Sequence, residues 1–178
     1  MTETSRDFSN TVYTKRSGIF LKDMANELKL PFEAYTHSAE ETEKIGFSIA
    51  ELIASDSSLP KFIALYGDLG VGKTAFVRGF TARFAENARV KSPTFALVNE
   101  YKGKELSVFH FDMYRINDED ELYSIGFYDY QDRRGICLTE WSENIEYALP
   151  DEYFSVTIEK CDVESPDLRK ISAMLIKR

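Results

Sequence analysis

Hydrophobic positions along the chain follow two spacings, one typical of helices and one typical of strands. Apolar residues recur every three or four positions over residues 42–53 and again over 76–84, and this spacing predicts two amphipathic helices. Ser38 and Glu41 precede the first segment in the arrangement of a capping box, in which they satisfy free amides at a helix start. We therefore expect that helix to run from there to about Ala54.

Short apolar runs between turn residues predict a set of strands. The runs cover residues 32–36, 61–66, 96–101, 106–112, 136–140, 153–159 and 170–177. The link near Gly103 is so short that the two strands it joins should form an antiparallel hairpin. Further on we expect a short acidic helix that starts at Asp118 and is capped by Asn117, an aromatic and irregular stretch over 126–135, and a short helix over 144–149.

Residues 1–30 differ from the rest and are interpreted as an N-terminal extension of unknown role, ahead of a domain over 31–178. Phe20, Met24 and Leu28 stand at four-residue spacing, which predicts one apolar helical face that either packs on the domain or binds a partner. The first ten residues carry no apolar signal segment, and no apolar run is long enough to span a bilayer. We expect a cytoplasmic protein without a membrane association.

Composition and charge narrow the class of protein. A chain of 178 residues with 43% hydrophobic and 13% aromatic residues suits one domain with a packed core and argues against disorder. A net charge of -8 repels phosphates, so the chain should not hold RNA or DNA strongly by itself. The basic pair Arg133 and Arg134 is interpreted as solvated surface charge. Cys137 and Cys161 match neither a metal site nor a disulfide framework, which indicates a reducing compartment.

A glycine-rich turn lies between the predicted strand over 61–66 and the predicted helix over 76–84. Its residues are Gly67, Asp68, Leu69, Gly70, Val71, Gly72, Lys73 and Thr74, and they match G-x-x-x-x-G-K-[ST] in full. Glycines let the backbone bend so that several amides point at one centre, and the following helix adds the positive end of its dipole. Lys73 should reach the β- and γ-phosphates, and the Thr74 hydroxyl should bind Mg²⁺. Because the N-K-x-D motif usual in GTPases is absent, ATP is the expected nucleotide.

Two acids at predicted strand ends are candidates for the rest of the site. Asp112 ends the strand over 106–112, and Glu140 ends the strand over 136–140. A P-loop site needs an acid near the metal, but spacing alone does not choose between these two. One would hold Mg²⁺ directly or through water, and the other would orient the attacking water. His110 should face the same side as Asp112, with a structural role favoured, and Trp141 packs either on a switch, on a partner or in the core.

Several segments together resemble the TsaE family of P-loop ATPases, which act in bacterial synthesis of tRNA threonylcarbamoyladenosine. The segments are Gly67–Thr74 with Phe76–Phe80, Lys91–Val98, His110–Arg115, Glu140–Glu143 and Leu149–Asp151. The resemblance spans about Phe32 to Lys177, and the order and spacing of the first four of these segments make it specific. In two respects the chain departs from the family: Ser142 stands where proline is usual, and residues 1–30 exceed the usual short N-terminus.

The resemblance implies a three-layer α/β sandwich with a mixed, partly parallel sheet. The cofactors would be ATP, held by Gly67–Thr74 together with Ala75, and Mg²⁺, bound by Thr74 and Glu140. Asp112 would be a switch residue needed for hydrolysis, and Thr94 would sense the γ-phosphate. Thr36 and Ser38 would lie near the adenine, with Arg169 approaching it from the C-terminal side.

The implied role is ATP hydrolysis in a complex with the TsaB–TsaD pair, where TsaD transfers the threonylcarbamoyl group and the partners hold the tRNA. Hydrolysis would be slow without the partners and would reset the complex between cycles. Two alternatives remain open from the sequence. One is a small-molecule kinase with Arg133 and Arg134 in a phosphate lid, and the other is a non-catalytic ATP-sensing adaptor.

Overall fold

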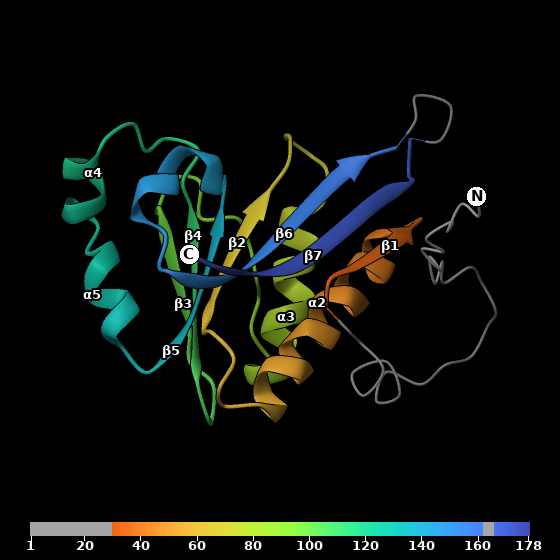
Figure 1. The fold of residues 1–178 in the computed structure, drawn as a ribbon, viewed down its shortest axis with the longest axis horizontal. Coiled ribbons are helices and arrows are strands. Elements are labelled where there is room, and N and C mark those ends of the chain that lie inside the picture. The colour runs from red at the N-terminus through yellow and green to blue at the C-terminus, as the bar shows by residue number, and fades with distance from the viewer. Residues whose placement is uncertain (1–29, 162–165) are drawn as a thin grey trace, which may run out of the picture.

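One seven-stranded sheet runs through the residues that the computed structural model describes, 30–161 and 166–178 (Figure 1). From edge to edge the strands are β1 (Phe32–Thr36), β7 (Arg169–Lys177), β6 (Glu152–Lys160), β2 (Phe62–Tyr66), β5 (Gly135–Glu140), β4 (Ser107–Asp112) and β3 (Val98–Tyr101). Neighbours are parallel from β6 to β4, whereas the β1–β7, β7–β6 and β4–β3 pairs are antiparallel. The predicted mixed sheet and the predicted hairpin are both confirmed.

Helices cover both faces of this sheet, which gives the three layers that the family resemblance implied. The helices α2 (Ala39–Ser55) and α3 (Lys73–Phe84) pack on one face. The other face carries α4 (Glu119–Ser124), α5 (Phe127–Asp132) and the 3₁₀ segment η1 (Ser142–Ala148). The central strands β4 and β5 are buried on both faces after their first residue, as expected for parallel strands between two helical layers.

Alternation along the central strands decides which side chains reach α3. On β4, Val108 belongs to the core under α2 and α3, whereas Phe109 and Phe111 belong to the opposite core. Because successive side chains of a strand point to opposite faces, His110 and Asp112 lie on the same face as Val108. By the same alternation on β5, Glu140 shares a face with Ile136 and Leu138. The buried polar end of each strand is therefore directed toward the start of α3.

The α2 and α3 helices approach each other until their backbones touch. A β-carbon added at Gly79 would lie 1.8 Å from the Glu43 carbonyl oxygen, and one added at Gly46 would lie 2.2 Å from the Phe76 carbonyl oxygen. Only glycine permits both approaches. The start of α2, next to Thr36, is consequently held close to the start of α3.

Three details of the predicted helices need correction. The stretch over 126–135 contains α5, because Gly126 adopts a φ of 69° and starts a second helix that buries Phe127. The acidic helix is capped by Asp118, whose carboxylate accepts the Glu121 amide at 3.0 Å, and not by Asn117. At α2 the cap on Ser38 is confirmed, but the Glu41 carboxylate accepts the amide of His37. The helix predicted over 20–28 lies outside the described residues.

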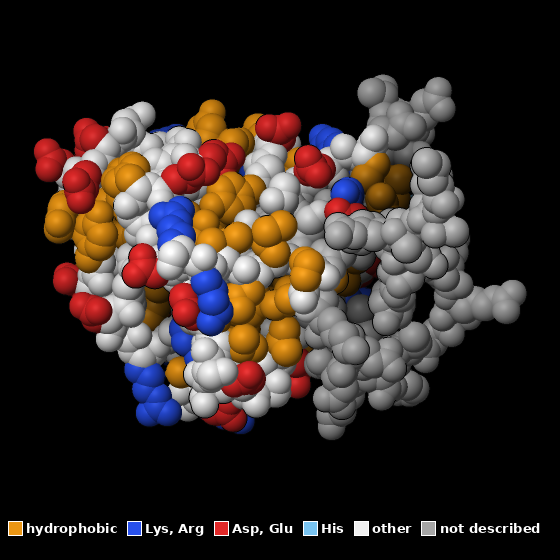
Figure 2. All heavy atoms as spheres, in the orientation of Figure 1, with side chains coloured by type: hydrophobic (Ala, Val, Ile, Leu, Met, Phe, Trp, Pro, Cys, Tyr) orange, Lys and Arg blue, Asp and Glu red, His pale blue; other side chains and the backbone are white. Residues whose placement is uncertain are grey.

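The surface carries charges of both signs. On the face shown in Figure 2, lysine and arginine side chains of the described residues are scattered among acidic ones and form no continuous basic band. This distribution agrees with the net charge of -8.

In the part of the chain that the structure describes, no helix is both long and apolar enough to cross a membrane.

Candidate functional site

The P-loop joins the end of β2 to the start of α3 and is bent at three glycines. Gly67, Gly70 and Gly72 have φ angles of 124°, 73° and 115°, in the left-handed region that side-chain-bearing residues rarely adopt. A β-carbon at Gly67 would lie 2.2 Å from the Ile158 carbonyl oxygen, whereas one at Gly70 would meet no heavy atom within 4 Å. The loop is thus packed against β6 on one side and open on the other, the shape that a phosphate cradle requires.

Lys73 is the first residue of α3 and is buried. Its ammonium donates to the carbonyl oxygens of Gly67 and, at 2.9 Å, of Asp68, and it lies 3.9 Å from the centre of the Trp141 ring. Burial lowers the pKa of Lys73, while the nearby carboxylates, foremost Glu140, oppose that shift. A cation held within the loop itself is well placed to meet a phosphate there.

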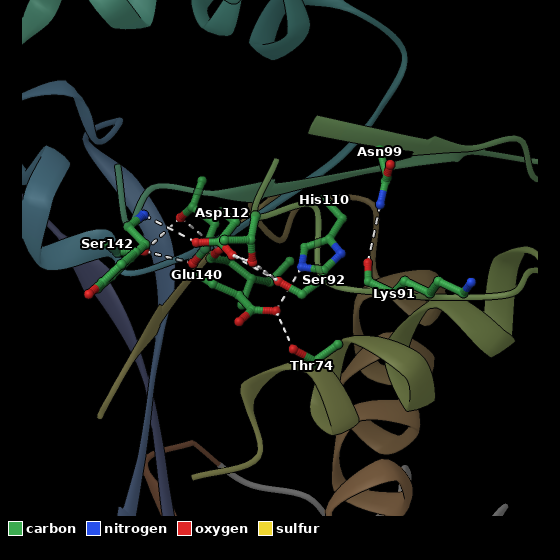
Figure 3. A network of polar contacts seen from close by, with 12 residues as sticks. Thr74, Lys91, Ser92, Asn99, His110, Asp112, Glu140 and Ser142 are labelled. Atoms are coloured by element: carbon green, nitrogen blue, oxygen red, sulfur yellow. Dashed lines mark hydrogen bonds and ion pairs between the residues drawn. The ribbon is translucent and has the colours of Figure 1, made fainter. Parts of the chain in front are cut away.

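Glu140 ends β5 and contacts both the first turn of α3 and His110 (Figure 3). It pairs in register with Leu65 of β2 on one side and with Asp112 of β4 on the other. Its Oε1 accepts the Thr74 hydroxyl at 2.9 Å and lies 2.8 Å from His110 Nε2. Glu140 and Thr74 are 66 positions apart in the sequence. They meet because β5, which ends at Glu140, is the direct neighbour of β2, which leads into the P-loop and the first turn of α3.

The Asp112 carboxylate hydrogen-bonds to the loop that contains Ser92 and Thr94, and not to the P-loop. Its Oδ2 accepts the hydroxyls of Ser92 and Thr94, at 2.8 and 2.7 Å, and its Oδ1 accepts the Tyr114 amide at 3.1 Å. Ser92 and Thr94 also hydrogen-bond each other at 2.8 Å. The two acids thus sit side by side, but each is bound by a different part of the chain (Figure 3).

The residues expected near the adenine gather on the other flank of the P-loop. Thr36 pairs in register with Arg169, and Arg169 Nε donates to the Val71 carbonyl oxygen of the P-loop at 3.0 Å. The buried Thr36 hydroxyl lies 3.0 Å from that of Thr42, and Thr42 in turn donates to the Ser38 carbonyl oxygen. The structure therefore brings Thr36, Ser38 and Arg169 together beside the loop.

Comparison with known proteins gives the same family as the resemblance seen in the sequence. Residues 36–170 match the family model for threonylcarbamoyl adenosine biosynthesis protein TsaE. This chain belongs to the TsaE family. Two relatives carry the name tRNA threonylcarbamoyladenosine biosynthesis protein TsaE. The one from Bacillus subtilis is 38% identical over 70% of this chain and 75% of its own length. The one from Haemophilus influenzae is 42% identical over 56% of this chain and 63% of its own length.

A solved structure supports the fold. The crystal structure of Bacillus subtilis YdiB aligns with a TM-score of 0.60 at 30% identity, over 83% of this chain and 86% of that one. The three-layer sandwich with a mixed sheet is therefore shared with a protein of known structure.

The donors present in this TsaE family member suit Mg²⁺ better than a transition metal. Among the described residues no cluster of three or more His, Cys, Asp and Glu side chains could hold a metal ion. Mg²⁺ does not need one, since it prefers one or two oxygen ligands from the protein together with water and phosphate oxygens. The Thr74 hydroxyl and the Glu140 carboxylate, 2.9 Å apart beside the P-loop, are such a pair.

The basic pair Arg133 and Arg134, considered for a phosphate lid, lies at the opposite end of β5 from Glu140, so the structure does not bring it to this site. The pair precedes Gly135 at the start of β5, whereas Glu140 stands at its end, about 16 Å away for a strand of this length. Arg133 is bound to the Glu100 carboxylate at 2.8 Å and stacks on Phe109 and Tyr130.

Some contacts of the site were not foreseen from the sequence. Ser92 was not singled out, although the S-P-T segment places a second hydroxyl two residues from Thr94. Ser142, at the position where the family resemblance predicted proline, is buried, and its hydroxyl lies 2.6 Å from the Thr139 hydroxyl, which ties down the turn after Glu140. Trp141 has a φ of 60°, and this conformation places its ring against Lys73.

An exposed hollow of about 590 Å³ adjoins the site. It is lined by Tyr114, Ile116, Asn117, Trp141 and Asn144. The rings of Tyr114 and Trp141 pack with centres 4.9 Å apart. Tyr114, which follows Asp112, therefore contacts Trp141, which follows Glu140, and Trp141 also contacts Lys73.

Proposed function

We propose that this chain binds ATP with Mg²⁺ and hydrolyses ATP as a component of the bacterial machinery that makes tRNA threonylcarbamoyladenosine. The observation that carries this proposal is the 2.9 Å hydrogen bond between Thr74 and Glu140. It joins the last residue of the P-loop motif to an acid on the neighbouring strand, which is the donor arrangement that P-loop ATPases use around their metal.

Each residue of the site has a distinct part in this proposal. Lys73 turns its ammonium from its own loop to the β- and γ-phosphates, and the loop Gly67–Thr74 with Ala75 surrounds them. Thr74 and Glu140 hold Mg²⁺, which when bound neutralises charge on the phosphate oxygens. Asp112 orients the attacking water and accepts its proton.

Thr94 provides the link between nucleotide and switch. Its hydroxyl is bound to Asp112 at 2.7 Å, so it must leave that carboxylate in order to bind the γ-phosphate. Such an exchange would free Asp112 at the moment when the triphosphate is in place. Thr36, Ser38 and Arg169 lie on the flank where the base would be held.

The proposed partner is the TsaB–TsaD pair, with TsaD performing the transfer to tRNA. The acidic charge of this chain supports that division, because a partner would have to hold the polyanion. The proposed location is accordingly the cytoplasm.

The test is an ATPase assay of the purified chain, alone and with purified TsaB–TsaD and tRNA. We expect slow hydrolysis alone and a clear change in rate when the pair is added. Fast turnover that ignores the partners would contradict the proposal, and ATP consumption that depends on a small-molecule acceptor would indicate a kinase. If an Asp112→Ala or Glu140→Ala variant that still binds ATP supports full tRNA modification over many turnovers, hydrolysis is dispensable and the chain is an adaptor.

A further inference from the structure

His110 is a buried polar residue for which the proposed mechanism has no part. Its side chain has no exposed surface, and its Nε2 lies 2.8 Å from Glu140 Oε1. The other ring nitrogen, Nδ1, is buried without a hydrogen-bond partner among the described residues. Figure 3 shows the imidazole on the same side of Glu140 as Thr74.

An imidazole with one unpaired nitrogen is an unfavourable choice for filling space. Val108, two positions earlier on the same face of β4, and Leu138, opposite His110 in register on β5, are apolar and fully buried. A leucine would fill such a position without leaving a buried acceptor unpaired. The compensating feature of His110 is its single strong contact, the bond to Glu140.

Two polar groups converge on one oxygen of Glu140. Thr74 Oγ1 and His110 Nε2 both contact Oε1, and no described residue donates to Oε2. Rotation about the terminal carboxylate bond is soft, so a carboxylate held by a single donor samples many orientations. Two donors on the same oxygen fix that rotation and leave Oε2 free to bind a cation or a cation-bound water.

The Thr74 contact is compatible with metal binding. A hydroxyl has one proton and two lone pairs, so Thr74 can donate to Glu140 and bind a cation at the same time. For His110 to donate to a carboxylate, which when ionised only accepts, its proton has to lie on Nε2.

We propose that His110 is a positioning residue that orients Glu140 for a divalent cation bound with the nucleoside triphosphate. It acts through Nε2–H on Glu140 Oε1 and touches neither nucleotide nor cation itself. This inference rests on the proposed function, since it assumes that Thr74 and Glu140 hold the cation. Residues that orient a metal ligand in this way typically contribute about 10- to 100-fold in metal affinity.

The experiment compares His110→Gln, His110→Asn and His110→Leu with the wild-type chain. The glutamine amide nitrogen is as many bonds from the β-carbon as Nε2 of histidine, whereas that of asparagine is one bond shorter. The two amides therefore differ in reach and share their chemistry. Binding of a non-hydrolysable ATP analogue is measured by calorimetry in EDTA and over a Mg²⁺ titration, and folding is checked by thermal melting.

We expect His110→Asn and His110→Leu to raise the Mg²⁺ midpoint about 10- to 100-fold, with unchanged binding in EDTA, and His110→Gln to restore most of the loss. An unchanged Mg²⁺ midpoint in both would overturn the proposal, as would an equal loss of binding in EDTA. If His110→Leu does not fold, the glutamine and asparagine variants decide. A wild-type chain that binds the analogue without any Mg²⁺ dependence would instead refute the proposed function.

A measurement on the unmodified chain tests the proposal independently. The chain has two histidines, His37 and His110, so the imidazole nitrogens are readily assigned by ¹⁵N NMR. We expect the proton of His110 on Nε2. A proton found only on Nδ1 would exclude donation to Glu140 and overturn the proposal.

Discussion

Asp112 and Glu140 occupy equivalent places in the sheet but are held in different ways. They pair in register at the ends of neighbouring parallel strands, both are almost fully buried, and both face α3. Glu140 is bound by Thr74 from a helix and by His110 from a strand. Asp112 is bound through Oδ1 by the Tyr114 amide and through Oδ2 by Ser92 and Thr94, from a loop whose neighbouring residue Phe95 is 86% exposed.

This difference indicates which acid suits which task. A metal ligand benefits from partners on rigid elements, because its geometry must be ready before the cation arrives. A switch residue benefits from partners on a segment with few packed contacts, because such a segment moves at little cost. Glu140 meets the first requirement and Asp112 the second. The predictions that follow test this division, from the largest expected effect to the smallest.

Exchanging each acid for its amide should separate the two tasks. We expect Asp112→Asn to reduce kcat about 10²- to 10⁴-fold, the usual contribution of a positioned base, with Mg²⁺-dependent ATP binding close to wild-type. Glu140→Gln should reduce turnover as well, but also remove most of the Mg²⁺ dependence of binding. Calorimetry and a phosphate-release assay on the same preparations measure both. If the two variants lost turnover and Mg²⁺-dependent binding to the same extent, the proposed division between a metal ligand and a switch residue would be wrong.

Removing the P-loop cation should weaken binding without unfolding the chain. Lys73→Ala loses a charge-assisted contact worth about 1.5–3 kcal/mol, so we expect ATP to bind roughly 10- to 150-fold more weakly. Arg78→Ala is the matched control, since Arg78 lies on the same helix but is paired with Glu43 at the surface. Calorimetry should show normal affinity for the control. Normal affinity in Lys73→Ala would place the phosphates elsewhere.

The hydroxyls around Asp112 should matter for hydrolysis more than for affinity. Each neutral hydrogen bond is worth about 0.5–1.5 kcal/mol, so Ser92→Ala and Thr94→Ala should each change the hydrolysis rate by roughly 2- to 12-fold. Thr94→Ser keeps the hydroxyl and should stay near wild-type. Single-turnover rates measure the effect. A loss of Mg²⁺ affinity in Thr94→Ala would mean that the loop also serves the metal side.

The aromatic pair after the two acids should report whether the two sides communicate. Trp141 is the sole tryptophan, and the Lys73 ammonium lies 3.9 Å from its ring centre, a contact worth about 0.5–1 kcal/mol. Binding of ATP should therefore change the tryptophan emission, and Lys73→Ala should remove that change. Tyr114→Leu should alter its size, because Tyr114 packs on Trp141. An unaltered response in Tyr114→Leu would show that the two strand ends act separately.

The sequence predicted the P-loop side of the site more completely than the switch side. The motif Gly67–Thr74 carries its own geometry, because its glycines dictate the bend and Lys73 and Thr74 follow at fixed spacing. The pattern of apolar runs also predicted that Asp112 and Glu140 end strands. It did not tell them apart, because that depends on strand order, which places β5 and not β4 beside β2.

Short elements and long-range pairs escaped the sequence for similar reasons. The helix α5 has only six residues, too few for a periodic pattern, and it depends on the positive φ of Gly126. Arg133 was considered for a phosphate lid because sequence position does not reveal which end of a strand faces the nucleotide. The interpretation of residues 1–30 as an N-terminal extension stays a prediction. The grouping of Thr36 with Arg169 follows from the pairing of β1 with β7, which joins the two ends of the domain.

The contact between α2 and α3 sets a fixed length inside the site. Because neither Gly46 nor Gly79 has a β-carbon, the backbones of the two helices come into contact, and a larger residue at either position would push them apart. The flank expected to receive the base begins on α2, and the triphosphate flank begins on α3. The spacing between these two helix starts, and so the room for any ligand that spans them, is therefore set by a backbone contact.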